Sequence, residues 1–213
     1  GEKNVIFTNN DSAYETALSL FQKGINIEAI VDNREEVDSK LIRETEKNNI
    51  KVYKGYTVVN TFGYKRIKKI SIMQLSKDGQ KVVGPKLSVT CDCLGISGGW
   101  TPAVHLFTQS GGKLKFRDED HVFIPDKYSS DQISIGACNG DFTLNEILST
   151  INNKLKEFLN IKEIDYKNLD VQSSFNKSKR NIWLLPSDKV IGKTKSFVDY
   201  QNDATAKDIK LAL

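Results

Sequence analysis

The chain has 213 residues, 38% of them hydrophobic and 27% charged, which are ordinary values for a globular protein that buries one large or two small cores. It holds no apolar run long enough to span a bilayer, so we expect no membrane partner. The net charge of +4 is spread over alternating Lys and acidic residues, and the densest basic stretch, 65–69, has no aromatic platform beside it, so we also expect no nucleic-acid partner.

The first part of the chain alternates strand and helix patterns. Short apolar runs predict strands, and the segment after the first run has the spacing of an amphipathic helix that Gly24 ends. In chain order, the pattern predicts a strand over 4–8, a helix over 12–23, a strand over 25–31, a helix over 35–48 and a strand over 50–53. This βαβαβ order is typical of a Rossmann-like domain, an α/β fold in which helices cover a parallel sheet.

After these elements the pattern changes to strands joined by short turns, which predicts a β-meander. The expected strands are 56–60, 64–75 and 86–89, then an apolar strand over 91–97 and two short strands over 113–116 and 121–124. A further strand over 132–136 precedes a loop and a helix over 143–160, and the polar remainder has extended pieces over 181–185 and 196–200.

The turn between the first strand and helix departs from a dinucleotide fingerprint. The glycine positions of G-x-G-x-x-G are taken by Thr8, Asn10 and Ala13, and only the alanine is compatible with the motif. Asn10 places a side chain where the pyrophosphate would approach, and Asp11 adds a negative charge at the helix N-terminus. Asp32 follows the second strand, where the ribose-binding acid belongs. The turn fits a Rossmann domain that has lost its ligand or an α/β unit that never had one, and both predict no NAD here.

The order of the segments resembles the two-dinucleotide-binding-domain flavoproteins, such as the thioredoxin-reductase-like enzymes. In that group one nucleotide-binding domain with a meander is inserted into another, interrupted one. The resemblance implies a degenerate inserted domain over 1–95 and the C-terminal half of the host NAD- or FAD-binding domain over 96–160. A linker and a degenerate iron–sulfur-like segment would occupy 161–213, leading to a further domain outside this chain.

Two glycine turns carry the candidate cofactor-binding residues that this resemblance implies. The first corresponds to the group's Ala-Thr-Gly-x-x-Pro turn and consists of Ser97, Gly98, Gly99, Trp100, Thr101 and Pro102. The second corresponds to the turn before the last helix and consists of Gly136, Ala137, Cys138, Asn139 and Gly140. In the group an Asp of that second turn holds the ribityl chain of FAD. Ala137 stands in its place, which favours NAD, a cofactor without ribityl; the glycines also fit ordinary turns.

Three longer segments resemble one family within this group, the α subunit of heterotetrameric sarcosine oxidase. They are 7–14, 97–113 and 197–209. The resemblance implies an internal fragment of an enzyme that oxidatively demethylates sarcosine to glycine, forms H2O2 and passes the one-carbon unit to tetrahydrofolate. It implies NAD in the α subunit, FAD and FMN in the whole complex, and β, γ and δ subunits as partners. It places no catalytic residue in this chain, which alone would be inactive and would bind NAD weakly or not at all.

The cysteines argue for a reducing, cytoplasmic location and against redox or metal chemistry. Cys91, Cys93 and Cys138 form neither a CxxC motif nor an even-numbered framework, so we exclude a disulfide reductase. We expect buried structural thiols, the first two sharing one face of a strand. Related amine-oxidising flavoproteins open an iron–sulfur segment with cysteines where this chain has Asp199 and Gln201, and neither supplies a thiolate.

The remaining candidates have structural interpretations. His105 and His121 lack the spacing of a metal site or a catalytic triad, and His105 is expected in a loop. Trp100 and Trp183 are expected in packing or in subunit contacts. Two alternatives stay open beside the sarcosine oxidase resemblance: a subunit of a related opine, cyanide-forming or amino-acid dehydrogenase complex, and a non-catalytic assembly module.

Overall fold

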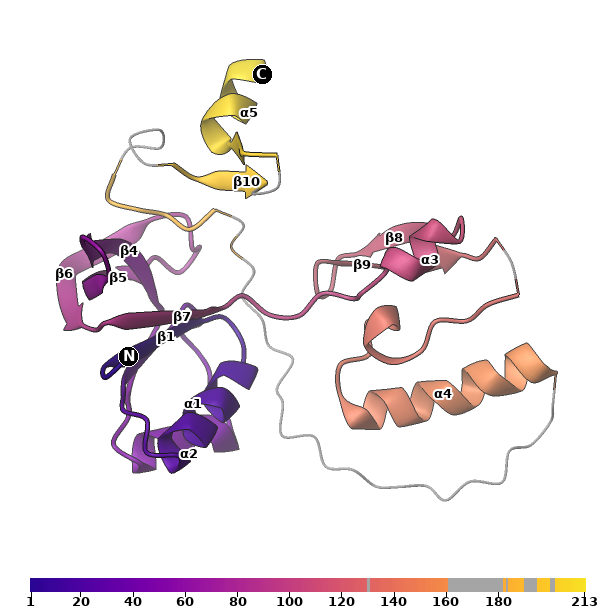
Figure 1. The fold of residues 1–213 in the computed structure, drawn as a ribbon, viewed down its shortest axis with the longest axis horizontal. Coiled ribbons are helices and arrows are strands. Elements are labelled where there is room, and N and C mark those ends of the chain that lie inside the picture. The colour runs from indigo at the N-terminus through magenta and orange to yellow at the C-terminus, as the bar shows by residue number, and fades with distance from the viewer. Residues whose placement is uncertain (130, 161–181, 183, 190–194, 200–201) are drawn as a thin grey trace.

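The computed structural model describes residues 1–129, 131–160, 182, 184–189, 195–199 and 202–213. Its first part contains a four-stranded parallel sheet with the order β3-β2-β1-β7. The elements are β1 (Asn4–Thr8), α1 (Ser12–Gln22), β2 (Ile27–Asp32), α2 (Lys40–Lys47), β3 (Lys51–Lys54) and β7 (Cys93–Ser97). This arrangement confirms the predicted Rossmann-like α/β fold (Figure 1).

Both faces of the parallel sheet are covered, by the two helices on one side and by the meander on the other (Figure 1). Because successive side chains of a strand point to opposite faces, Ile6 of β1 packs among the helices. Its neighbours Val5 and Phe7 pack with Ile70 and Ile72 of the meander. Burial on both faces explains why β1 and β2 are nearly continuous apolar runs in the sequence.

The second helix is shorter than the predicted 35–48. It begins at Lys40, because Ser39 has an extended backbone and its hydroxyl accepts a hydrogen bond from the backbone N–H of Ile42, which is the geometry of a helix N-cap. Val37, within the predicted helix, instead lies in the loop before it and is buried in the helix-side core.

The meander consists of β4 (Tyr56–Gly63), β5 (Ile67–Leu75) and β6 (Val82–Thr90), antiparallel in the order β4-β5-β6. Its outer strands extend beyond the predicted 56–60 and 86–89. The middle strand β5 contributes the fully buried Ile70 and Ile72 to the core shared with the parallel sheet. The meander therefore completes the core of the Rossmann-like part.

The strand β7 returns the chain to the first domain, where it forms the edge of the parallel sheet beside β1. It pairs with β1 from Asn4 opposite Cys93 to Thr8 opposite Ser97. The predicted boundary after residue 95 falls inside this strand, so the sheet of the first domain continues to Ser97. The assignment of the later segments to a host domain and a linker stays a prediction.

The middle of the chain forms a hairpin and helices set apart from the parallel sheet (Figure 1). The elements are α3 (His105–Gln109), β8 (Lys113–Arg117), β9 (Val122–Lys127), the 3-10 helix η1 (Gly136–Asn139) and α4 (Leu144–Leu159). The predicted helix over 143–160 is confirmed. Thr143 caps it, exchanging hydrogen bonds with Glu146 in a capping box.

The predicted strand over 132–136 is wrong. Gly136 has a φ of +72°, a left-handed backbone conformation that strand residues do not adopt. It is the first residue of a 3-10 helix. The carbonyl of Ser134 accepts a hydrogen bond from the Lys154 ammonium at 2.9 Å, so a helix side chain satisfies it rather than a neighbouring strand.

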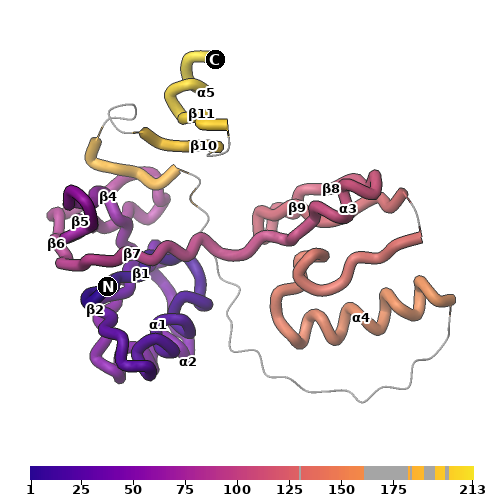
Figure 2. Tube along the Cα trace, in the orientation of Figure 1, coloured from indigo at the N-terminus to yellow at the C-terminus, as the bar shows by residue number. Residues whose placement is uncertain are grey.

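The last described residues form a small unit drawn in yellow in Figure 2. β10 (Phe197–Asp199) pairs antiparallel with β11 (Ala204–Thr205), which leads into α5 (Ala206–Ala212). Of the predicted extended piece 181–185, the described residues 182, 184 and 185 form no strand. Trp183, Tyr200 and Gln201 lie outside the described residues. Within the described ranges, no helix has the length and apolarity needed to cross a membrane.

Candidate functional site

Three strands of the parallel sheet end side by side at the edge where the sequence places a nucleotide turn. The register puts Thr8 of β1 opposite both Asp32 of β2 and Ser97 of β7. Ligands of open α/β sheets bind outside the carboxyl ends of the strands. The side chains at this edge therefore decide whether the domain can hold a nucleotide.

Asp32 is fully buried, and both of its carboxylate oxygens are occupied. Oδ1 accepts hydrogen bonds from the backbone N–H and the Nε–H of Arg34, at 2.9 and 3.0 Å. Oδ2 accepts from the Tyr14 hydroxyl at 2.8 Å and from Nη2 of Arg34 at 2.7 Å. A carboxylate offers about four lone-pair positions. Protein donors fill them, so Asp32 holds no acceptor for a ribose hydroxyl.

Arg34 links Asp32 to the start of α1. Its Nη2 lies 2.8 Å from Oδ1 of Asp11, and the side chains of Arg34 and Asp11 are 3% and 1% exposed. Burial alone would lower the pKa of the guanidinium, but hydrogen bonds and charge attraction from Asp32 and Asp11 more than offset it, and the pKa of Arg34 lies above its ordinary value. Arg34 therefore remains a cation in the interior, between two carboxyl groups.

Tyr14 completes this buried group from α1. Its side chain is fully buried, and its pKa is raised, first by burial and then by the neighbouring Asp32. The phenol therefore stays protonated and donates to Asp32. We call Asp11, Tyr14, Asp32 and Arg34 the Arg34 cluster.

Asn10 fills the turn between β1 and α1. Its amide donates hydrogen bonds to the carbonyl and the hydroxyl of Ser97 at 3.3 and 3.1 Å, and its Oδ1 accepts from the backbone N–H of Ser12 at 3.1 Å. The hydroxyl of Thr8 bonds both the N–H and the carbonyl of Asn10, each at 3.1 Å. Asn10 thus satisfies a backbone N–H at the start of α1 that would otherwise be free for an anion.

The first predicted glycine turn lies against this closed turn. The indole N–H of Trp100 donates to the hydroxyl of Ser12 at 3.2 Å, although the Trp100 side chain is 61% exposed. Gly99 has a φ of +99°, a left-handed conformation that favours glycine. Of the other members, Pro102 is buried, Ser97 is half-buried, and Gly98 and Thr101 are exposed.

The second predicted glycine turn lies elsewhere, between α4 and β9. Lys154 of α4 donates to Oδ1 of Asn139 at 2.6 Å, and Arg117 of β8 donates to the carbonyl of Gly140 at 3.0 Å. The Cys138 thiol donates to the carbonyl of Ile135 at 3.0 Å. Of the remaining members, Gly136 is buried and Ala137 is exposed.

The described structure does not bring the two predicted turns together. Residues 97–100 contact the turn between β1 and α1, whereas residues 136–140 contact α4, β8 and β9. The role of both turns in cofactor binding stays a prediction.

The thiols differ from what the sequence predicts. Cys91 is buried but Cys93 is exposed, so the prediction of two buried thiols on one face is wrong. Cys91 precedes β7, and its N–H donates to the carbonyl of Lys68 in the meander at 3.2 Å. Burial and then the charge of Asp92 raise the pKa of the Cys91 thiol, which makes it a poor nucleophile. The described residues contain no cluster of His, Cys, Asp and Glu that could hold a metal ion.

The histidines are placed as structural residues. His105 is the first residue of α3 rather than a loop residue, and it is exposed. His121 has a φ of +54° in the turn between β8 and β9, and its ring contacts that of Phe116 edge-on, with the centroids 6.0 Å apart.

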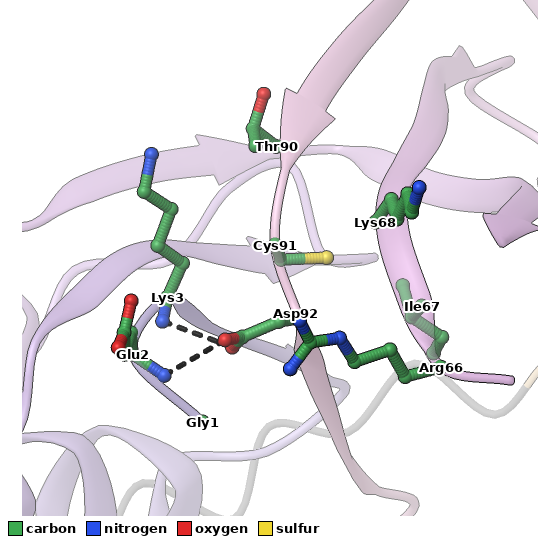
Figure 3. Close-up of a pocket in the computed structure, with 9 residues that line it drawn as sticks. All are labelled: Gly1, Glu2, Lys3, Arg66, Ile67, Lys68, Thr90, Cys91 and Asp92. Atoms are coloured by element: carbon green, nitrogen blue, oxygen red, sulfur yellow. Dashed lines mark hydrogen bonds between the residues drawn. The ribbon is translucent and has the colours of Figure 1, made fainter.

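A cavity of about 670 Å³ lies near the amino ends of β1 and β7 (Figure 3). The Arg34 cluster lies beside the carboxyl ends of the strands, at the opposite end of the sheet. The lining residues of the cavity are Gly1, Glu2, Lys3, Arg66, Ile67, Lys68, Thr90, Cys91 and Asp92. The carboxylate of Asp92 accepts hydrogen bonds from the backbone N–H groups of Lys3 and Glu2, at 3.0 and 2.9 Å, and these lower its pKa. Backbone N–H groups thus occupy the Asp92 carboxylate. The cavity is lined by both acidic and basic side chains.

The sequence located Asp32 correctly at the end of β2 but did not indicate its partners. Arg34 follows it by two residues, and Tyr14 is the third residue of α1. The one available signal was an arginine just past a strand whose last residue is acidic. Nothing in the periodicity shows that the arginine folds back over that strand.

Comparison with known proteins finds relatives that are all sarcosine oxidase α subunits. The chain is 30% identical over 220 residues to sarcosine oxidase subunit alpha of Corynebacterium sp. strain P-1, covering 98% of this chain and 22% of that protein. It is 28% identical over 224 residues to sarcosine oxidase subunit alpha of Rhizobium meliloti strain 1021, covering 100% of this chain and 20% of that protein. The chain thus spans about a fifth of the length of these relatives. The predicted resemblance to the α subunit is confirmed.

Two solved structures resemble the fold more distantly. The thioredoxin reductase of T. acidophilum matches with a TM-score of 0.45 and 19% identity, over 73% of this chain and 53% of that one. FprA of Mycobacterium tuberculosis in complex with NADPH matches with a TM-score of 0.47 and 13% identity, over 78% and 56%. No family model matches the chain.

Proposed function

We propose that this chain, similar over nearly its whole length to sarcosine oxidase α subunits, is an internal part of such a subunit. The observation that carries the proposal is 30% identity over 98% of the chain. The matched relative is more than four times as long, since the alignment covers 22% of it. We therefore expect the activity of the whole protein to need parts outside this chain.

The whole complex would oxidatively demethylate sarcosine to glycine, reduce oxygen to H2O2 and pass the one-carbon unit to tetrahydrofolate. It would act in the cytoplasm as an assembly of α, β, γ and δ subunits with FAD, FMN and NAD. The contribution of this chain would be scaffolding and subunit contacts. The residues of the Arg34 cluster are buried and bonded to one another, which suits a structural role.

Residues 97–102 and 136–140 would border the NAD of a host domain completed by other parts of the subunit. Two features support this role. Gly99 and Gly140 have φ values of +99° and +86°, and such turns let a backbone approach a ligand closely. Ala137 is exposed and carries no carboxylate, which agrees with a cofactor that lacks a ribityl chain.

Expression of the complete α polypeptide with its partner subunits tests this proposal. We expect a copurifying complex that forms H2O2 and glycine from sarcosine, and no such activity from the 213-residue chain alone. Peroxide formation from an opine or another amino acid, with none from sarcosine, would instead favour the related dehydrogenase alternative. A complex that forms but oxidises none of these would favour the assembly module.

A further inference from the structure

We propose that the nucleotide position of the first domain is permanently closed by its own side chains, and that the Arg34 cluster takes the structural place of a ligand. The domain would then be a module that folds without any nucleotide. This inference rests on contacts among residues 8–34 and 97–100 and does not depend on the sarcosine oxidase proposal.

The ribose position is closed because its carboxylate is saturated. Tyr14 and Arg34 donate hydrogen bonds to both carboxylate oxygens of Asp32, at 2.7 to 3.2 Å. A ribose hydroxyl could bind only by displacing one of these donors. Displacing Arg34 would leave buried carboxyl groups without their cation, which is costly in the protein interior.

The phosphate position is closed for two further reasons. Asn10 lies where the fingerprint has its second glycine, and it is 5% exposed and bonded on both sides, to Ser97 and to Ser12. Asp11, the residue before α1, adds an acidic side chain that is already paired with Arg34. Both the space and the charge at this helix N-terminus therefore disfavour a phosphate.

The last residue of β7 and the segment that follows it hold the turn between β1 and α1 in place. Ser97 accepts hydrogen bonds from Asn10 through both its carbonyl and its hydroxyl, and Trp100 donates to Ser12. The same segment leads out of the first domain toward α3. The closure thus also fixes the point at which the chain leaves this domain.

Amide NMR of the chain during titration with NAD+, NADH and NADPH tests the closure directly. We expect the backbone signals of residues 9–12 and the Arg34 Nε–H signal to stay unshifted at millimolar nucleotide. Saturable shifts of these signals would overturn the proposal. Shifts confined to residues 136–140 would leave the closure intact and support the cofactor role proposed for that turn. Absence of shifts everywhere would support the closure while counting against nucleotide binding by this chain.

A stability comparison tests the structural role of the cluster. Arg34→Met should lower Tm by on the order of 10 °C, because it leaves buried carboxyl groups unpaired. Arg43→Met is the matched control, since Arg43 pairs with Asp38 in solvent, with side chains 61% and 66% exposed. It should shift Tm by less than about 4 °C. A Tm of Arg34→Met equal to that of the control would contradict the structural role.

Discussion

At the residue scale, Tyr14 ties the first helix to the second strand through a single hydroxyl. Tyr14→Phe removes the donor at 2.8 Å from Asp32 and leaves the ring packed in the helix-side core. We expect the free energy of unfolding to fall by about 1.5–3 kcal/mol, the usual loss for a hydrogen bond to a charged group. Denaturant unfolding measures this. Tyr64→Phe, at a side chain that is 95% exposed, is the control and should stay within about 0.5 kcal/mol of wild type.

Tyr14 also predicts how stability depends on alkaline pH. Its pKa is raised in the folded state by burial and by Asp32, so folding favours the protonated phenol. The stability contributed by this group is fully present below the unfolded pKa of about 10 and is lost as pH rises above it toward the folded pKa. The free energy of unfolding, measured on both sides of that pH, should fall more steeply with rising pH for the wild type than for Tyr14→Phe. Equal slopes would show that Tyr14 is not linked to folding.

The cysteines give a chemical test of the packing. Cys93 is exposed, whereas Cys91 is 1% exposed and its pKa is raised by burial and by Asp92. A maleimide should therefore label Cys93 in the native chain at neutral pH and reach Cys91 only in denaturant. Mass spectrometry of the digested chain identifies the sites, with Cys93→Ser as the control. Native labelling of Cys91 at a comparable rate would contradict the described packing of the meander on β7.

Single residues were the least predictable part of the site. Position in a strand is enough to place Asp32 at the end of β2, and the missing glycines are enough to predict that the turn is a poor nucleotide site. The partners of Asp32 depend on the direction in which the Arg34 side chain points, and no local sequence pattern predicts that direction. The exposure of Cys93 was missed for a similar reason, because Cys91 lies in the connection before β7, whereas Cys93 is the first residue of that strand.

At the element scale, the end of β4 depends on a glycine. Gly63 has a φ of +155°, and an added Cβ would lie 1.9 Å from the carbonyl oxygen of Arg66. Gly63→Ala should therefore cost about 1–3 kcal/mol of stability through strain and overpacking. Gly98→Ala is the matched control, since a Cβ there meets nothing within 4 Å. Thermal unfolding of both variants checks the prediction, and equal midpoints would contradict the close approach of Gly63 to Arg66.

Elements with a repeating apolar pattern were predicted well, and those defined by single contacts were not. The strands of the parallel sheet and α4 follow from their apolar runs and spacing. The start of α2 does not follow from its pattern. The sequence alone extends the helix back to residue 35, whereas the Ser39 cap makes it begin at Lys40. The strand expected over 132–136 does not form, because Gly136 has a left-handed backbone conformation. In addition, the Ser134 carbonyl, which strand pairing would need, accepts a hydrogen bond from Lys154.

At the scale of the whole molecule, the chain consists of a closed Rossmann-like part and a separate segment that carries the second glycine turn. The order of elements was sufficient to predict the first part, and the residues of 7–14, 97–113 and 197–209 carried the resemblance to sarcosine oxidase α subunits. The relation of the two glycine turns could not be predicted from order alone. The structure ties residues 97–100 to the first domain and residues 136–140 to α4, β8 and β9.

The most direct measurement is a crystal structure of the complete α polypeptide grown with NAD+. We expect cofactor density bordering residues 97–102 and 136–140, with Asp32 still bonded to Tyr14 and Arg34. Density for a pyrophosphate at residues 9–12, with a ribose hydroxyl on Asp32 and Arg34 displaced, would contradict this expectation.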